Sequence, residues 1–183
     1  MSKGLFISFE GTEGCGKSTQ VRLLTERLQS LGHRVKTLRE PGGTPIGEEI
    51  RHTLKHSKAN AEMKPETELL LMNASRAQLV RELIQPALEA NEIVICDRFY
   101  DSTTAYQGYG RQMDLAKVRS IIELAVGELK PRITFYMKVS PAVSEERVRS
   151  RQAILPFVRD RFEESDNAFF ERVTQGFEAI AKA

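Results

Sequence analysis

Apolar residues along the chain fall into short runs that alternate with longer segments of helical spacing. The run Ile93–Cys96 is apolar at every position, which is typical of a strand buried on both faces. Strands are expected at about residues 5–10, 34–38, 93–96 and 133–139. The helical spacing predicts helices at about 17–31, 46–55, 66–90 with a bend near Pro86, 114–127, 141–151 and 162–181.

This alternation of strands and helices is typical of a parallel sheet whose two faces are both covered by helices. The crossover connections between parallel strands are expected to be right-handed. No internal repeat divides the chain. We therefore expect a three-layer α/β fold and a single domain over residues 1–183.

The charge of the chain is nearly balanced, with 27 basic and 25 acidic residues. No block of like charge indicates a nucleic-acid partner, and no apolar segment reaches membrane-spanning length. Cys15 and Cys96 lie far apart and form no C-x-x-C pair. These features favour a reduced, cytoplasmic protein without a nucleic-acid or membrane partner.

A glycine-rich loop follows the first expected strand and leads directly into the first expected helix. Its pattern, Gly11-x4-Gly16-Lys17-Ser18, matches the phosphate-binding loop (P-loop) at every fixed position. The glycines allow backbone N–H groups to surround an anion, and the helix adds its positive end. The pattern predicts that the ATP phosphates bind to Gly11, Thr12, Glu13, Gly14, Cys15, Gly16, Lys17, Ser18 and Thr19. Lys17 is expected to reach the β- and γ-phosphates, and Ser18 to bind Mg²⁺.

Asp97 and Arg98 directly follow the buried strand Ile93–Cys96. Open α/β sheets bind their ligands at the carboxyl ends of the strands. Asp97 is therefore a second candidate for the Mg²⁺ site, and the planar guanidinium of Arg98 suits a phosphate. The alternative is a strand that ends in two solvated charges. The N-K-x-D and D-x-x-G patterns of GTPases and the kinase H-R-D loop are absent, which favours a small-molecule phosphotransferase.

Four motifs together resemble the successive signatures of the thymidylate kinase family. They are F-E-G-T-E-G-C-G-K-S-T (9–19), E-P-G-G-T-P-I-G-E-E-I-R (40–51), N-A-S-R-A-Q-L-V (73–80) and D-R-F-Y-D-S-T-T-A-Y-Q-G (97–108). The resemblance spans about residues 4–175 and implies the P-loop NTPase fold. It also implies that ATP and dTMP react to give ADP and dTDP, with Mg²⁺ as cofactor.

The resemblance also implies a role for individual residues. Arg51 and Arg98 correspond to arginines that bind the dTMP phosphate, and Arg76 to the arginine that reads a thymine carbonyl. Glu13 corresponds to an acidic loop residue near the sugar and the phosphate-binding arginine, and the resemblance implies that it is catalytic together with Lys17 and Arg98. The rest of the implied substrate pocket consists of Glu40, Met72, Thr103 and Gln107, with Met72 at a position that is aromatic in most relatives. From the residues alone, Arg51 is equally suited to a surface ion pair with Glu48. Arg76 interrupts an apolar helix face and needs a buried partner or a ligand.

Arginines at 147, 149, 151, 159 and 161 surround a segment that resembles the family's lid, at about residues 147–161. In the bacterial type the lid carries the arginine that stabilises the transition state, and Cys15 in the glycine loop agrees with that type. We expect Arg151 to be this arginine, with Arg149 and Arg159 as alternatives. The alternative is that these arginines belong to a solvated, basic end of a helix without a catalytic role.

Relatives in this family continue to a further strand and a final helix, and we expect both to be missing here because the sequence stops at Ala183. Relatives also pair through helices, which implies a homodimer. Two other functions stay open from the residues: a related deoxynucleoside or nucleotide kinase of other specificity, and a nucleotide-binding module without turnover. A nucleoside kinase would need a base to deprotonate a sugar hydroxyl.

Overall fold

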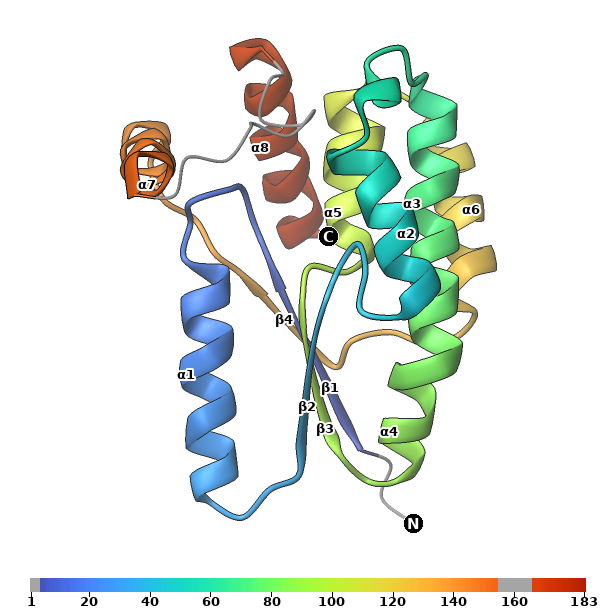
Figure 1. Ribbon diagram of the computed structural model, residues 1–183, viewed down its shortest axis with the longest axis vertical. Helices are drawn as coiled ribbons and strands as arrows, with labels where there is room; N and C mark the ends of the chain where they lie inside the picture. Colours follow the sequence, from blue (N-terminus) through green and yellow to red (C-terminus); the bar gives the residue numbers. More distant parts are fainter. Residues whose placement is uncertain (1–3, 155–165) are drawn as a thin grey trace.

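Four parallel strands form one sheet at the centre of the molecule, in the order β2-β3-β1-β4 (Figure 1). Their bounds are Leu5–Glu10 for β1, Val35–Arg39 for β2, Ile93–Asp97 for β3 and Ile133–Tyr136 for β4. The structure is a computed structural model that describes residues 4–154 and 166–183, without the side chains of residues 58, 141 and 151–154. The four expected strands are confirmed, although β4 is shorter than the predicted 133–139.

Helices cover both faces of the sheet, as expected for the three-layer α/β fold. Alternate strand residues point to opposite faces. Ile7, Phe9 and Ile95 pack with Val21 of α1 (Lys17–Ser30). On the other face, Phe6 and Val94 belong to a larger cluster with residues of α3 (Pro65–Leu79), α4 (Gln85–Glu89) and α6 (Leu115–Val126).

The helical stretch that contains Pro86 is interrupted by a π-helical segment just before this proline, close to the bend that the sequence predicted. The α-helix α3 passes into one π-helical segment, η2 (Val80–Ile84), and then into α4. Pro86 has no N–H, and its ring excludes the carbonyl four residues earlier, so an ordinary α-helical turn cannot continue through it. A π-helical segment accommodates the mismatch.

A second helical stretch follows Arg98 and corrects the sequence-based prediction, which placed no helix there. It consists of α5 (Tyr100–Thr103) and the π-helix η3 (Thr104–Gly110). Two glycines, Gly108 and Gly110, are poor helix formers and obscured the signal. The stretch gains its stability from packing, because Ala105 and Tyr106 share an apolar cluster with α8 (Asn167–Lys182).

The remaining helices lie around the carboxyl end of the sheet (Figure 1). They are α2 (Pro45–Lys55), the short 3₁₀ helix η1 (Lys58–Asn60) and α7 (Pro141–Ile154). Thr44 caps α2 by accepting a hydrogen bond from the Gly47 N–H. None of the helices in the described parts of the chain has the length and apolar character needed to cross a membrane.

Candidate functional site

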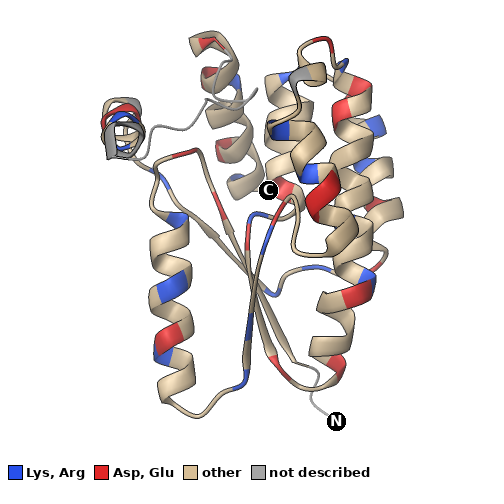
Figure 2. Cartoon of the chain, viewed as in Figure 1, with Lys and Arg blue, Asp and Glu red and all other residues tan. Residues whose placement is uncertain are grey.

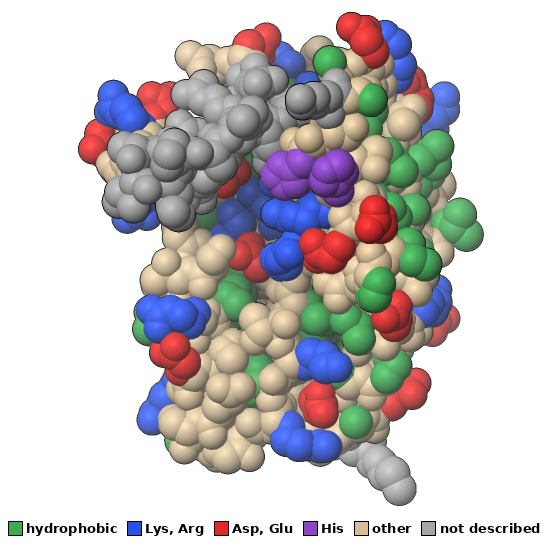
Figure 3. Space-filling model, viewed as in Figure 1, with side chains coloured by type: hydrophobic (Ala, Val, Ile, Leu, Met, Phe, Trp, Pro, Cys, Tyr) green, Lys and Arg blue, Asp and Glu red, His purple; other side chains and the backbone are tan. Residues whose placement is uncertain are grey.

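A cavity of about 790 Å³ opens at the carboxyl ends of β1 and β3. It is lined by more cations than anions: Lys17, Arg39, Arg51, Lys55, Arg76, Arg98, Lys138 and Arg147 against Glu13, Glu40 and Asp97. Figure 3 shows Lys and Arg side chains gathered in a hollow of the surface. Charged pairs in the sequence, Asp97-Arg98 and Arg39-Glu40, reach this cavity because they end neighbouring parallel strands. The excess of positive charge suits an anionic ligand.

The glycine-rich loop forms one wall of the cavity and adopts backbone conformations that few other residues tolerate. Gly11 has φ = 137° and Gly16 has φ = 98°. A Cβ at Gly11 would lie 2.3 Å from the carbonyl oxygen of Met137, which directly follows β4. The loop therefore needs glycine both for its conformation and for its close approach to the neighbouring chain segment.

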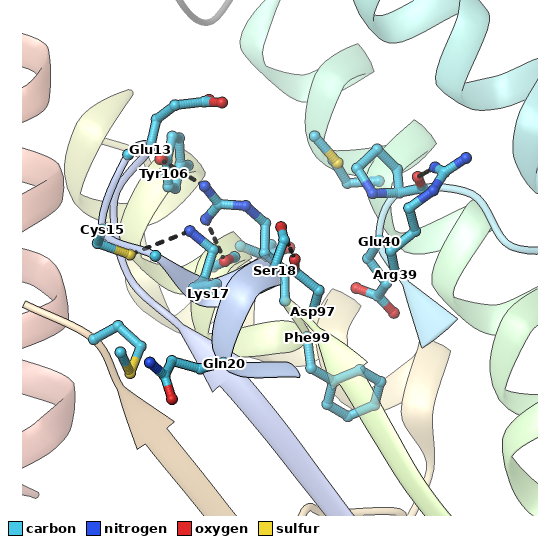
Figure 4. A pocket seen from close by; sticks show the side chains of 18 of the residues that line it. Glu13, Cys15, Lys17, Ser18, Gln20, Arg39, Glu40, Asp97, Phe99 and Tyr106 are labelled. Carbon is cyan, nitrogen blue, oxygen red and sulfur yellow. Dashed lines mark hydrogen bonds between the residues drawn. The ribbon is translucent and has the colours of Figure 1, made fainter. Parts of the chain in front are cut away.

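Lys17, the first residue of α1, lies under this loop and is 7% exposed. Its Nζ donates hydrogen bonds to the Gly11 oxygen at 3.0 Å and the Thr12 oxygen at 2.7 Å. It also lies 3.5 Å from the Sγ of Cys15 (Figure 4). Burial, followed by the nearby charge of Arg98, lowers the pKa of Lys17 to about 8.

Ser18 and Asp97 face each other across the floor of the cavity (Figure 4). The Ser18 hydroxyl donates to the Asp97 Oδ2 at 2.6 Å. A hydroxyl and a carboxylate oxygen are donors that suit a hard divalent cation such as Mg²⁺. The two residues predicted to share a metal site are therefore brought together.

Arg98 turns from the end of β3 back toward the glycine loop. Its backbone has φ = 72°, which is unusual for a residue other than glycine and is held by the bond from its N–H to the Phe9 oxygen. Nη1 donates to the Gly11 oxygen at 2.8 Å and to the Ser102 hydroxyl at 3.0 Å. The guanidinium carbon lies 5.2 Å from the centre of the Tyr106 ring. The anchored backbone and these contacts fix the guanidinium beside Lys17.

Glu10, at the end of β1, is a buried carboxyl behind Arg98. It accepts hydrogen bonds from the Phe99 N–H at 2.7 Å and from the Ser102 hydroxyl at 2.6 Å. Burial, followed by the charge of Asp101, raises the pKa of Glu10 to about 8. Because Ser102 bonds both Glu10 and Arg98, the three side chains form one connected network.

Arg76 of α3 is 2% exposed and forms an ion pair with Glu40. Its Nε and Nη2 donate to the Glu40 Oε2 at 2.9 and 2.7 Å, Nη1 donates to the Asn73 Oδ1, and Nη2 also to the Phe99 oxygen. These four bonds use four of the five N–H donors of the guanidinium. The fifth, on Nη1, has no partner among the described residues, and Arg76 lines the cavity. Glu40 is therefore the buried partner that the sequence analysis expected for Arg76. The second carboxylate oxygen of Glu40, Oε1, is buried and has no hydrogen-bond partner among the described residues.

Gln107, on η3, also lines the cavity and is 1% exposed. Its Nε2 donates to the Oε1 of Glu68, a fully buried residue of α3, at 2.8 Å. Thr103, one helical turn earlier, is also buried and lines the cavity. Met72 lines the cavity as well and packs partly against the apolar cluster of Tyr106 and α8.

Arg51 reaches the cavity from α2, and its Nη1 donates to the Pro41 oxygen at 2.8 Å. Glu48, the ion-pair partner suggested by sequence spacing, bonds Arg39 at 3.1 Å. On the opposite wall, α7 contacts the glycine loop. The Ser144 hydroxyl donates to the Glu13 oxygen at 2.5 Å, and Arg147 donates to the Gly14 oxygen at 3.2 Å.

Comparison with known proteins agrees with this arrangement. The family model for thymidylate kinase matches residues 9–183. Thymidylate kinase from Prosthecochloris aestuarii is 49% identical over 97% of this chain and 80% of its own length, and that from Deinococcus radiodurans is 45% identical over 100% and 85%. A crystal structure of thymidylate kinase from Ehrlichia chaffeensis has a TM-score of 0.78 at 35% identity and covers 98% of this chain and 85% of its own. The chain belongs to the thymidylate kinase family.

Membership in the thymidylate kinase family makes the chain a phosphotransferase and confirms the P-loop fold expected from the sequence. Most of the residues predicted for the site line one cavity. These are residues 13–19 of the loop together with Glu40, Arg51, Met72, Arg76, Asp97, Arg98, Thr103 and Gln107. Gly11 and Thr12, at the start of the loop, are not among the residues that line the cavity, and their carbonyl oxygens accept hydrogen bonds from Lys17.

Some predicted residues lie outside the described part of the structure. The side chain of Arg151 is among them, as is Arg159 with the rest of residues 155–161 in the predicted lid at 147–161. Arg149 is described, and it pairs with Glu146 at 2.8 Å on the exposed side of α7.

Other cavity residues escaped the sequence analysis, chiefly Arg39, Lys55, Ser102 and Lys138, and Arg147 was noted there only as part of the lid. Arg39 is the last residue of β2, as Asp97 is of β3, and Lys138 lies two residues beyond the carboxyl end of β4. The rule that pointed to Asp97 could therefore have found them. Nothing in the sequence pattern distinguishes Lys55 from a surface lysine.

Proposed function

We propose that the chain transfers the γ-phosphoryl group of ATP to dTMP, giving ADP and dTDP. A phosphate oxygen of dTMP attacks the γ-phosphorus, and the bond from that phosphorus to the bridging oxygen of ADP breaks. The observation that carries the proposal is one continuous cavity that is lined by Lys17, Ser18, Asp97 and Arg98 and also by Arg76 and Gln107. Groups suited to phosphates and groups suited to a base edge thus share one cavity.

Residues of the glycine loop would bind the ATP phosphates through their N–H groups, and Lys17 would neutralise charge on the β- and γ-phosphates. For this, Lys17 exchanges its bonds to the Gly11 and Thr12 oxygens for bonds to phosphate. Ser18 and Asp97 would hold Mg²⁺, which would help to neutralise the negative charge of the ATP phosphates when bound. Thr19 follows Ser18 on α1 and completes the proposed donor site.

At the acceptor end, Arg98 and Arg51 would bind the dTMP phosphate, with Glu13 beside them. A phosphate monoester has a second pKa of about 6 and is already an anion at neutral pH. The acceptor therefore needs no general base, in contrast to the sugar hydroxyl of a nucleoside. Catalysis then depends on aligning two anions and stabilising the transferred group, which the arginines and Lys17 can do.

The base would lie between α3 and η3, against Met72 and Thr103. Thymine presents a carbonyl oxygen next to an N–H at this edge. The remaining N–H of Arg76 can donate to the carbonyl, and an amide oxygen on Gln107 can accept from the N–H. Cytosine presents the opposite pattern, an amino group next to a bare nitrogen, and would leave both protein groups unpaired.

Three further features complete the proposal. The chain acts as one kinase domain, with the lid at about 147–161 closing over ATP and Arg151 supplying transition-state charge. It works in the cytoplasm. It forms a homodimer through α3 and α6, where Leu70 and Leu124 are 57% and 82% exposed. Hydrophobic side chains gather on the side of the molecule next to α2 and α3 in Figure 3.

The proposed reaction is tested by measuring ADP release with ATP and Mg²⁺ over dTMP, dUMP, dCMP, AMP and GMP, with thymidine as a further acceptor. We expect dTMP to give the highest kcat/KM. Preference for another monophosphate would overturn the substrate assignment, and phosphorylation of thymidine would indicate a nucleoside kinase. Tight nucleotide binding without ADP release would indicate a binding module.

A further inference from the structure

Glu68 is a buried carboxylate that the proposed reaction does not use. It lies on α3, two helical turns before Arg76, and is 0% exposed. A charged group in such a place is costly unless it is paired and hydrogen-bonded. Its partners are Arg111, whose Nη2 lies 3.1 Å from Oε2, and the Gln107 amide, whose Nε2 lies 2.8 Å from Oε1.

Arg111 is itself held in place by α8. Its guanidinium carbon lies 4.5 Å from the centre of the Phe169 ring. Arg172, one turn further along α8, donates to the Gly110 oxygen at 3.0 Å, directly before Arg111. The carboxylate therefore occupies a fixed position, with its negative charge compensated by a cation that cannot easily move away.

The chemistry of this contact decides which way the Gln107 amide points. A carboxylate can only accept hydrogen bonds, so the NH₂ group of the amide must face Glu68. The amide oxygen is then directed away from Glu68. Within the described residues, that oxygen has no protein donor and is not among the buried unpaired atoms, while Gln107 lines the cavity. The oxygen is thus available to a ligand as an acceptor.

We infer that Glu68 is a positioning residue that sets base specificity by fixing the orientation of the Gln107 amide. An amide side chain alone can present either an acceptor or a donor by rotating half a turn, and so could accept thymine or cytosine. With Glu68 behind it, only the acceptor faces the base. This inference deepens the proposed function, because it assumes that the base lies between Arg76 and Gln107.

Glu68→Gln tests this orientation. The variant keeps the size of the side chain but offers either an oxygen or an NH₂ group to Gln107, so both amide orientations become accessible. The readout is the ratio of kcat/KM for dTMP to that for 5-methyl-dCMP, two substrates that differ only at the base edge. Any contribution of Arg76 is the same in both enzymes and cancels. We expect the ratio to fall by about tenfold or more, since a flipped amide removes one of the two mismatches with cytosine.

Two control variants separate specificity from structure. Glu66→Gln makes the same change at an exposed position of α3 and should leave the ratio unchanged. Glu68→Asp keeps a group that only accepts and should retain the preference for dTMP even if it lowers both rates. Loss of stability alone would reduce kcat/KM for both substrates by the same factor and leave their ratio unchanged. An unchanged ratio in folded Glu68→Gln would overturn the role of Glu68.

If Glu68→Gln does not fold, the same question is answered in the unaltered protein by NMR of the Gln107 side-chain NH₂ group. Slow hydrogen exchange at this group would support the fixed orientation, and exchange as fast as for exposed glutamines would overturn it. Failure of the proposed function is recognised separately, because the unaltered enzyme would then show no preference for dTMP over 5-methyl-dCMP.

Discussion

Lys17 is the residue on which the chemistry of the site depends most directly, and its surroundings make its charge sensitive to pH. Burial lowers its pKa to about 8, so the ammonium loses its proton as the pH rises through that value. The neutral amine cannot neutralise phosphate charge. We therefore expect kcat/KM, which reports the free enzyme, to decline above about pH 8. In kcat this decline should lie at higher pH, because bound phosphates favour the charged lysine. Initial rates measured from pH 6 to 10 provide the check.

Glu10 requires a control in this experiment, since burial raises its pKa to about 8 as well. Glu10→Gln removes that titration and keeps an oxygen that can accept from the Phe99 N–H. If the decline near pH 8 persists in Glu10→Gln, it belongs to Lys17. Its disappearance would instead assign the decline to Glu10, which acts on Arg98 through Ser102.

Single residues also show how far the sequence could predict the site. The loop residues and Asp97 were predictable because each stands at a fixed position relative to a strand end. The pairing of Arg76 with Glu40 was not, because it joins two segments 36 residues apart that only the folded chain brings together. Glu68 gave no signal at all, since an acidic residue near the start of a helix is an ordinary surface feature.

At the scale of elements, the apolar runs predicted every strand and most helices, whereas the segment 100–110 was missed. Its helical structure depends on contacts with α8, which lies about sixty residues further along the chain. Tertiary packing of this kind overrides local propensity and cannot be inferred from a short window. The same packing places Tyr106 and Gln107 on the cavity wall.

The contact between α8 and η3 is close enough that adding a methyl group at Gly176 is expected to lower the stability of the protein. A Cβ at Gly176 would lie 2.8 Å from Cγ and 2.9 Å from Cβ of Tyr109, atoms close to the backbone that cannot swing away. Overpacking costs about 1–3 kcal/mol, and Gly→Ala in a helix returns about 1 kcal/mol. Gly176→Ala should therefore lower Tm by a few degrees, roughly 2–4 °C for each kcal/mol lost. Calorimetry provides the measurement, with Gln175→Ala at an exposed neighbouring position as the matched control. An unchanged or higher Tm would contradict the prediction and show that η3 can shift to accommodate the added methyl group on α8.

At the scale of the whole molecule, the proposed homodimer predicts that exposed leucines on α3 and α6 are covered by a second copy. Leu70→Glu combined with Leu124→Glu would place charges in that interface, so sedimentation should show a dimer for the unaltered protein and a monomer for the variant. Leu31→Glu, at the end of α1 and 55% exposed, is the control and should stay dimeric. A monomeric unaltered protein at micromolar concentration would contradict the proposal.

The position of β1 inside the sheet has a consequence for the synthesis of the protein. Among the described strands β1 leaves the ribosome first, yet its two neighbours are β3 and β4, which begin at Ile93 and Ile133. The glycine loop is also held by Arg98 through the Gly11 oxygen. A nascent chain that ends before Ile93 therefore carries the complete ATP-binding motif without the neighbours that shape it. Nucleotide affinity should be gained late in translation, after β3 has emerged and paired.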